Sequence, residues 1–152
     1  MMISIKAKIP PPIVALTFGI LVIYSKSIFP KIEIGRGGFF GSFMIIIGLI
    51  IILSAIIQFK KYKTTITPLS PLNATKLIVH GIYKFSRNPM YLGLLLILSG
   101  ISIIQNPIGG LLFVPSFILY ITHFQIIPEE SAMLDLFKDD FSKYKENVRR
   151  WI

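Results

Sequence analysis

Residues whose side chains could bind a polar ligand gather in two short segments of this chain. The first segment is GIYKFSRNPMYLG, residues 81–93, and the second is the acidic pair Glu129 and Glu130. The polar and aromatic residues of the first segment that could contact a ligand are Tyr83, Arg87, Asn88 and Tyr91. Guanidinium, amide, hydroxyl and carboxylate groups together can hold a charged molecule, provided that the fold brings the two segments to one place.

Each segment also has a purely structural interpretation. Asn88 can cap a helix that begins at Pro89, and Arg87 can extend its charged end toward lipid headgroups. Glu129 and Glu130 follow a proline and would complement the positive end of a helix dipole. From the local sequence alone both interpretations stay open, so the elements that position the two segments must decide between them.

The composition indicates a membrane protein. Hydrophobic residues make up 53% of the 152 residues, charged residues only 15%, and the mean hydropathy is +0.72. A soluble domain of this length has too little interior for that much apolar surface, so we predict one membrane-embedded domain, residues 1–152. The absence of cysteine excludes disulfides and thiolate chemistry. The net charge of +9 fits anionic headgroups at a membrane surface better than nucleic acid.

Stretches with little charge predict the membrane spans. Residues 1–59 contain two of them, the short stretch 13–28 and the uncharged stretch 37–59. Residues 88–128 are another 41 positions without charge, apart from His123 when it is protonated. As one helix they would be about 60 Å long, roughly twice the hydrocarbon thickness of a bilayer. They must therefore fold back, and QNPIGG, residues 105–110, has the best turn and helix-start residues.

The sequence thus predicts an all-α bundle of about four transmembrane helices. Thirteen of the sixteen lysine and arginine residues would lie on the side that holds both termini and the loop of residues 60–87, so that side is predicted to be cytoplasmic. The hairpin would return Glu129 to the depth of Arg87. After the fourth span, apolar residues at spacings of three and four predict an amphipathic cytoplasmic helix. These residues are Met133, Phe137, Phe141, Tyr144 and Val148.

Residues 77–93 and 129–152 together resemble the isoprenylcysteine carboxyl methyltransferase and phospholipid methyltransferase family of integral membrane enzymes. That family has a glycine-tyrosine step, an Arg-His-Pro-x-Tyr motif, a membrane hairpin, a Glu-Glu pair and a helix with Phe-Gly-x-x-Tyr-x-x-Tyr. The likeness extends over residues 64–152. It implies an enzyme that transfers a methyl group from S-adenosylmethionine to a lipophilic acceptor, either a prenylcysteine-type carboxylate or a phospholipid amine.

The resemblance also implies which residues contact the two ligands. The implied cofactor contacts are Thr75, Lys76, Leu77, Ile78, Tyr83, Asn88, Pro89, Met90, Tyr91, Glu129 and Glu130. The implied substrate contacts are Gln125 and Arg87. No catalytic residue is assigned, because methyl transfer from a sulfonium is an in-line displacement that mainly needs alignment and exclusion of water. No metal site is expected, since His80 and His123 are far apart in the sequence.

Three residues depart from the family pattern. Asn88 stands in place of the commoner histidine, which keeps hydrogen bonding but removes any proton transfer by that residue. Gln125 stands where prenylcysteine enzymes have an arginine, and the loss of that cation weakens the assignment of a carboxylate substrate. Lys138 replaces the glycine that follows the phenylalanine of the C-terminal motif.

Two other functions stay open beside the methyltransferase. Membrane sterol reductases share a related C-terminal region but bind NADPH, and this chain is shorter and lacks their additional spans. A non-catalytic membrane scaffold that kept the fold is the other alternative.

Overall fold

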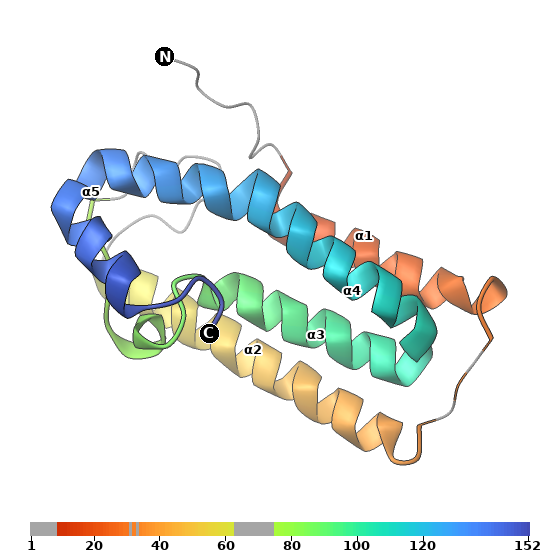
Figure 1. Ribbon diagram of the computed structural model, residues 1–152. Coiled ribbons are helices and arrows are strands. Elements are labelled where there is room, and N and C mark those ends of the chain that lie inside the picture. The colour runs from red at the N-terminus through yellow and green to blue at the C-terminus, as the bar shows by residue number, and fades with distance from the viewer. Residues whose placement is uncertain (1–8, 31, 33, 63–74) are drawn as a thin grey trace.

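The computed structural model describes residues 9–30, 32, 34–62 and 75–152, and every regular element in this part of the chain is helical, which confirms the all-α prediction. The helices are α1 (Pro11–Tyr24), α2 (Gly37–Tyr62), α3 (Pro89–Gln105), α4 (Pro107–Ile121) and α5 (Ile127–Asn147). The short turns are η1 (Ser25–Ser27), η3 (Gly81–Lys84) and the π-helical turn η4 (Thr122–Ile126). Figure 1 shows α1 to α4 side by side, with α5 bending at one end of the bundle.

α3 and α4 form the hairpin that the long uncharged stretch predicts. α3 ends at Gln105 and α4 begins at Pro107, so the turn is a single residue, Asn106. The Asn106 side chain is fully buried and caps α4, because its Oδ1 accepts a hydrogen bond from the Gly109 backbone at 3.2 Å. Its Nδ2 donates to the Phe29 carbonyl at 3.3 Å and so ties the turn to the segment after α1.

α2 and α3 run antiparallel and approach each other at four glycines. Gly41 and Gly48 are seven residues apart on α2, and Gly93 and Gly100 have the same separation on α3, so each pair lies on one helix face. A Cβ atom added at Gly48 would lie 2.6 Å from the Gly93 carbonyl oxygen, and one at Gly41 would lie 2.6 Å from that of Gly100. Close backbone contact through small residues is the usual way in which helices associate in a bilayer.

The main apolar core lies between α1, α3 and α4. Its buried members include Val22 on α1, Leu98 on α3 and Phe117 on α4. Tyr91 belongs to the same cluster, near the start of α3. The core therefore holds the first turn of α3, and with it the residues of the first polar segment, in a fixed position relative to α4.

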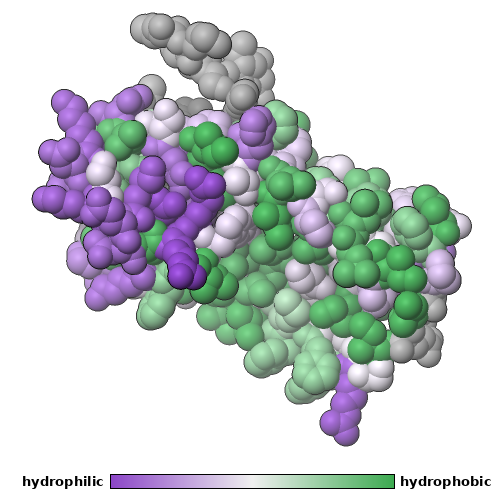
Figure 2. Space-filling model, viewed as in Figure 1, coloured by the Kyte–Doolittle hydropathy of each residue, from purple (hydrophilic) through white to green (hydrophobic). Residues whose placement is uncertain are grey.

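The outer surface suits a lipid environment. Within the described residues, two continuous helical segments are long and apolar enough to cross a membrane, Gly37–Tyr62 and Pro107–Asn147. Pro11–Ser27 and Pro89–Gln105 are shorter apolar helices. Figure 2 shows apolar residues over most of the visible face and polar residues concentrated at the end where α5 bends. Within Pro107–Asn147 the uncharged part ends at Pro128, so we place the end of the apolar span before Glu129. The count of four spans stays a prediction.

α5 is the predicted amphipathic helix, but no loop separates it from α4. The π-helical turn η4 joins the two helices and accommodates Pro128, which has no N–H to donate to the preceding turn. The apolar stripe of α5 packs inward, as its spacing predicts: Phe141, Tyr144 and Val148 are buried, and Met133, Phe137, Leu77 and Val79 pack against them.

The bend in α5 occurs at Lys138, whose backbone has φ 42° and ψ −113°. A residue with a side chain adopts such a conformation at a cost, whereas glycine does not, and glycine is the residue that the resembling family has here. We expect Lys138→Gly to raise the free energy of unfolding by about 1 kcal/mol, as measured by thermal unfolding in detergent. Asp139→Gly, at an ordinary helical position, should lower it by about 0.5–1 kcal/mol. Equal destabilisation by both changes would contradict this explanation of the bend.

Candidate functional site

The fold brings the two polar segments together at one end of the bundle. The Tyr91 hydroxyl donates a hydrogen bond to Glu129 Oε1. Arg87 forms an ion pair with Glu130, with 3.1 Å between Nη2 and Oε1. The side chains of this pair are only 10% and 11% exposed, so solvent screens their interaction weakly. The meeting of Arg87 with the acidic pair, which the hairpin predicts, is present in the structure.

The C-terminal tail after α5 returns to the same place. Arg150 holds Glu130 with two bonds, from Nη2 to Oε2 at 2.7 Å and from Nε to Oε1 at 3.1 Å. The Arg87 backbone N–H donates to the Arg149 carbonyl at 3.1 Å, and the Asn88 Nδ2 donates to the Arg150 carbonyl at 3.0 Å. The tail is thus bonded to the turn that precedes α3 through both backbone and side chains.

These contacts exclude the two structural interpretations of the first segment. The Asn88 side chain makes no capping hydrogen bond to α3, so the capping interpretation is wrong. Its side chain donates to the Arg150 carbonyl of the tail instead, whereas Asn106, in the other Asn-Pro pair, does cap its helix. Arg87 does not extend to the surface either, because its guanidinium is almost fully buried against Glu130.

The pKa of Glu129, at the polar end of the apolar span, is raised above the ordinary value of a carboxyl group. Burial raises the pKa of Glu129 to about 8; the hydrogen bond from Tyr91 lowers it, and the charge of Glu130 adds to the rise. Near neutral pH this carboxyl can therefore gain or lose a proton with small changes in its surroundings. Perturbed acidity of this kind is common at functional sites.

Several buried polar atoms have no hydrogen-bond partner in the described part of the chain. They are Arg87 Nε and Nη1, Gln125 Oε1 and Thr122 Oγ1. Leaving a buried donor or acceptor unpaired is costly, so such atoms indicate places where a ligand or water supplies the partner. For Arg87 the missing partner is an acceptor, and an anionic oxygen is the strongest one.

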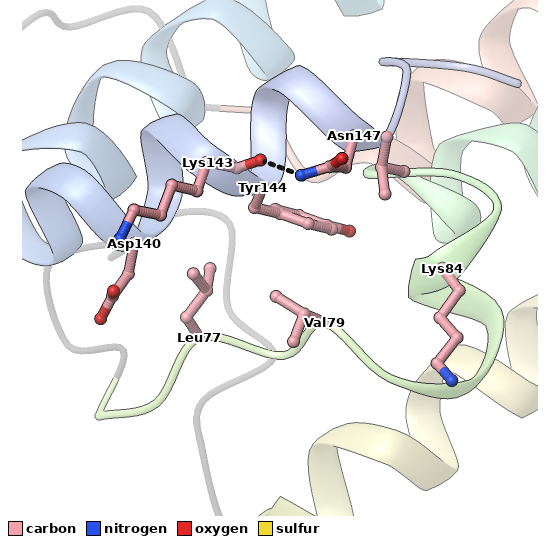
Figure 3. Close-up of a pocket in the computed structure, with 8 residues that line it drawn as sticks. Leu77, Val79, Lys84, Asp140, Lys143, Tyr144 and Asn147 are labelled. Atoms are coloured by element: carbon pink, nitrogen blue, oxygen red, sulfur yellow. Dashed lines mark hydrogen bonds between the residues drawn. The ribbon is translucent and has the colours of Figure 1, made fainter.

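A cleft of about 600 Å³ opens between the segment before η3 and the second half of α5. Figure 3 shows Leu77 and Val79 facing Tyr144 across it, with Lys84, Asp140, Lys143 and Asn147 around its edge. The Tyr144 hydroxyl donates to the Tyr83 carbonyl at 2.6 Å and joins the two walls. Its walls are apolar and its rim carries charged residues, and its volume lies within the range of about 300–1,000 Å³ that small-molecule sites have.

The other residues that the resemblance implies are spread over several parts of the structure. Leu77 lines the cleft, while Ile78 points the opposite way and is buried against Ala55 and Tyr83, as expected of an extended segment. Met90 packs on that second cluster, and Pro89 is buried at the start of α3. Thr75 and Lys76 are exposed. Gln125 is fully buried in η4, where its Nε2 donates to the Ile9 carbonyl at 2.7 Å.

The sequence reasoning missed Arg150. The signal in the sequence was weak: two adjacent arginines after the amphipathic helix, followed by Trp151, which packs partly buried against the main core. Such a pair is ordinarily a solvent-exposed feature. Which of the two arginines turns inward depends on how the chain leaves α5.

Comparison with known proteins gives one family and one relative of note. A family model described as phospholipid methyltransferase matches residues 37–140, which include the Arg87–Tyr91 turn and the acidic pair but stop before the C-terminal tail. An uncharacterized protein of Haemophilus influenzae is 43% identical over 63 residues, which cover 41% of this chain and 100% of that protein. No solved structure matches the chain.

Proposed function

Because the chain belongs to the phospholipid methyltransferase family, we propose that it uses S-adenosylmethionine to methylate a lipophilic acceptor, a phospholipid amine or a prenylcysteine-type carboxylate. The observation that carries this proposal is the meeting of Arg87, Tyr91 and the acidic pair at the polar end of an apolar helical bundle. A ligand bound there would lie beside both the aqueous phase and the lipid, as transfer from a soluble donor to a lipophilic acceptor requires.

The residues present fit S-adenosylmethionine. Its carboxylate suits Nε and Nη1 of Arg87, which have no partner among the described residues, so we assign Arg87 to the donor and not to the substrate that the resemblance implies. Its ribose hydroxyls or amino group suit the Glu129 carboxylate. The cleft between Leu77, Val79 and Tyr144 offers apolar walls for the adenine ring, next to the same turn. When bound, the cofactor supplies an activated methyl group on its sulfonium sulfur.

The protein's own contribution is to align the donor and to exclude water from the acceptor. A carboxylate acceptor needs no base, whereas an amine acceptor must lose a proton. Glu129 is better placed than Glu130 to take that proton, because its pKa is close to 8 and the Glu130 oxygens are already occupied by two arginine side chains. The same carboxyl would then orient the donor and receive the proton.

We place both termini and the site on the cytoplasmic side, since thirteen lysine and arginine residues would lie there. A cysteine introduced at Ser142 should be labelled by an impermeant thiol reagent only from the cytoplasm, and one at Gln105, at the far end of α3, only from outside. Labelling of both from one face would overturn this orientation.

Calorimetric titration of the detergent-solubilised protein with S-adenosylmethionine, S-adenosylhomocysteine and NADPH tests the function. We expect binding of the first two ligands and none of NADPH. Binding of NADPH alone would establish the reductase alternative, and binding of none of the three would support the scaffold. Transfer of a labelled methyl group to lipid extracts would then identify the acceptor.

A further inference from the structure

The C-terminal tail, residues 148–152, lies outside the region that matches the family, yet it completes the ion-pair network of the site. Its backbone accepts hydrogen bonds from the Arg87 N–H and from the Asn88 side chain. Trp151 anchors its end against the main core. These contacts, none of which involves the Arg150 side chain, bring Arg150 to Glu130.

Glu130 makes three bonds to cations, and Arg150 provides two of them. The Glu130 side chain is only 11% exposed, so its charge would be poorly solvated if Arg87 were its single partner. Among the described residues, Arg87 approaches Glu130 through Nη2 alone, and its Nε and Nη1 have no partner there. With Arg150 absent, Glu130 would compete for those free donors.

We propose that Arg150 is a positioning residue of the donor site: it neutralises Glu130 and holds its side chain, so that Glu129 and the free donors of Arg87 are available to the ligand. This inference rests on the proposed function. The charged and titratable groups that face the acidic pair are Arg87 from the turn before α3, Tyr91 from α3, Tyr83 from η3 and Arg150 from the tail.

Loss of Arg150 should change the pH at which Glu129 ionises, which a merely structural role would not do. The charge of Glu130 already disfavours ionisation of Glu129, and removing a cation from Glu130 would strengthen that effect. Glu129 would then ionise at higher pH. The pH at which the ligand affinity reaches half of its maximum would rise with it. A shift of one pH unit corresponds to about a tenfold change in affinity on the acidic side of the profile.

The test measures S-adenosylhomocysteine affinity from pH 6 to pH 9 for Arg150→Gln and Arg150→Lys, with Lys145→Gln as the control. Lys145 is an exposed cation on α5, so its variant has the same change in net charge. We expect Arg150→Gln to bind about tenfold more weakly at pH 7 and to have its midpoint at higher pH. Arg150→Lys should be intermediate, and Lys145→Gln should match the unmodified protein.

A second experiment combines Arg150→Gln with Glu130→Gln. The loss of Arg150 should have little effect on ligand affinity once residue 130 carries no charge. We expect Arg150→Gln to change the affinity less than twofold in that background. Two results would overturn the inference while leaving the proposed function intact. One is that Arg150→Gln has the same affinity as the unmodified protein at every pH. The other is that Arg150→Gln lowers the affinity equally with Glu130 present and with Glu130→Gln. If Arg150→Gln does not fold, Arg150→Lys and the double variant decide. Absence of ligand binding by the unmodified protein would overturn both proposals.

Discussion

Glu129→Gln is expected to lower the affinity for S-adenosylmethionine and S-adenosylhomocysteine about 10- to 100-fold, while the protein stays folded. A hydrogen bond to a charged group contributes about 1.5–3 kcal/mol, and glutamine keeps the shape of the side chain but not its charge. Glutamine can also still accept the hydrogen bond from the Tyr91 hydroxyl, so the contact with α3 is retained. Titration calorimetry measures the affinity, and thermal unfolding in detergent checks the fold.

The affinity for the ligand should depend on pH, because Glu129 must be ionised to bind it. In the free protein Glu129 has a pKa of about 8, so below that pH it is mostly protonated, and a ligand that needs the carboxylate must displace the proton. Affinity should therefore rise as the pH increases toward 8 and level off above it. In Glu129→Gln that rise should disappear, leaving only the titration of the ligand itself.

Glu146→Gln is the matched control, because Glu146 is an exposed acid on the same helix. It should bind the ligand like the unmodified protein at every pH. An unchanged affinity for Glu129→Gln together with a lower melting temperature would mean that Glu129 has only a structural role at the end of the apolar span.

Gly48→Ala is expected to destabilise the protein by about 1–3 kcal/mol, the usual cost of an added methyl group in a fully packed contact. The new Cβ would lie 2.6 Å from the Gly93 carbonyl oxygen and 2.8 Å from Ile97 Cγ1. A main-chain oxygen of α3 cannot move aside without moving that helix. Because α3 carries Tyr91, ligand affinity should fall together with stability.

Gly38→Ala, also on α2, is the control for this substitution. Apart from the adjoining residues and the backbone of its own helix, no atom of the described residues lies within 4 Å of a Cβ placed there, so the change in stability should stay within about 0.5 kcal/mol. Thermal unfolding in a single detergent compares the two variants. Equal stability of Gly48→Ala and Gly38→Ala would show that the α2–α3 contact tolerates a wider separation than the structure has.

Much of the fold can be predicted from the sequence, because it depends on the lengths of the uncharged stretches and on the thickness of the bilayer. A stretch of 41 residues without fixed charge cannot cross a bilayer once, so residues 88–128 had to fold back, and the turn occurs at Asn106, where the helix-start residues are. That return brings the acidic pair to the end of the bundle that holds Arg87, where Arg87 contacts Glu130. The burial of Phe141 and Tyr144 likewise follows from their spacing on α5.

The partners of individual side chains were decided by the tertiary structure. Asn88 and Asn106 precede prolines in the same way, yet one donates to the tail and the other caps a helix. The Asn-Pro pair itself is the same at both places, so it does not determine which partner the side chain finds. Arg150 reaches Glu130 because α5 bends at Lys138 and the tail crosses the turn before α3. Such contacts join residues far apart in the sequence, and only the packing of whole helices determines which polar group meets which.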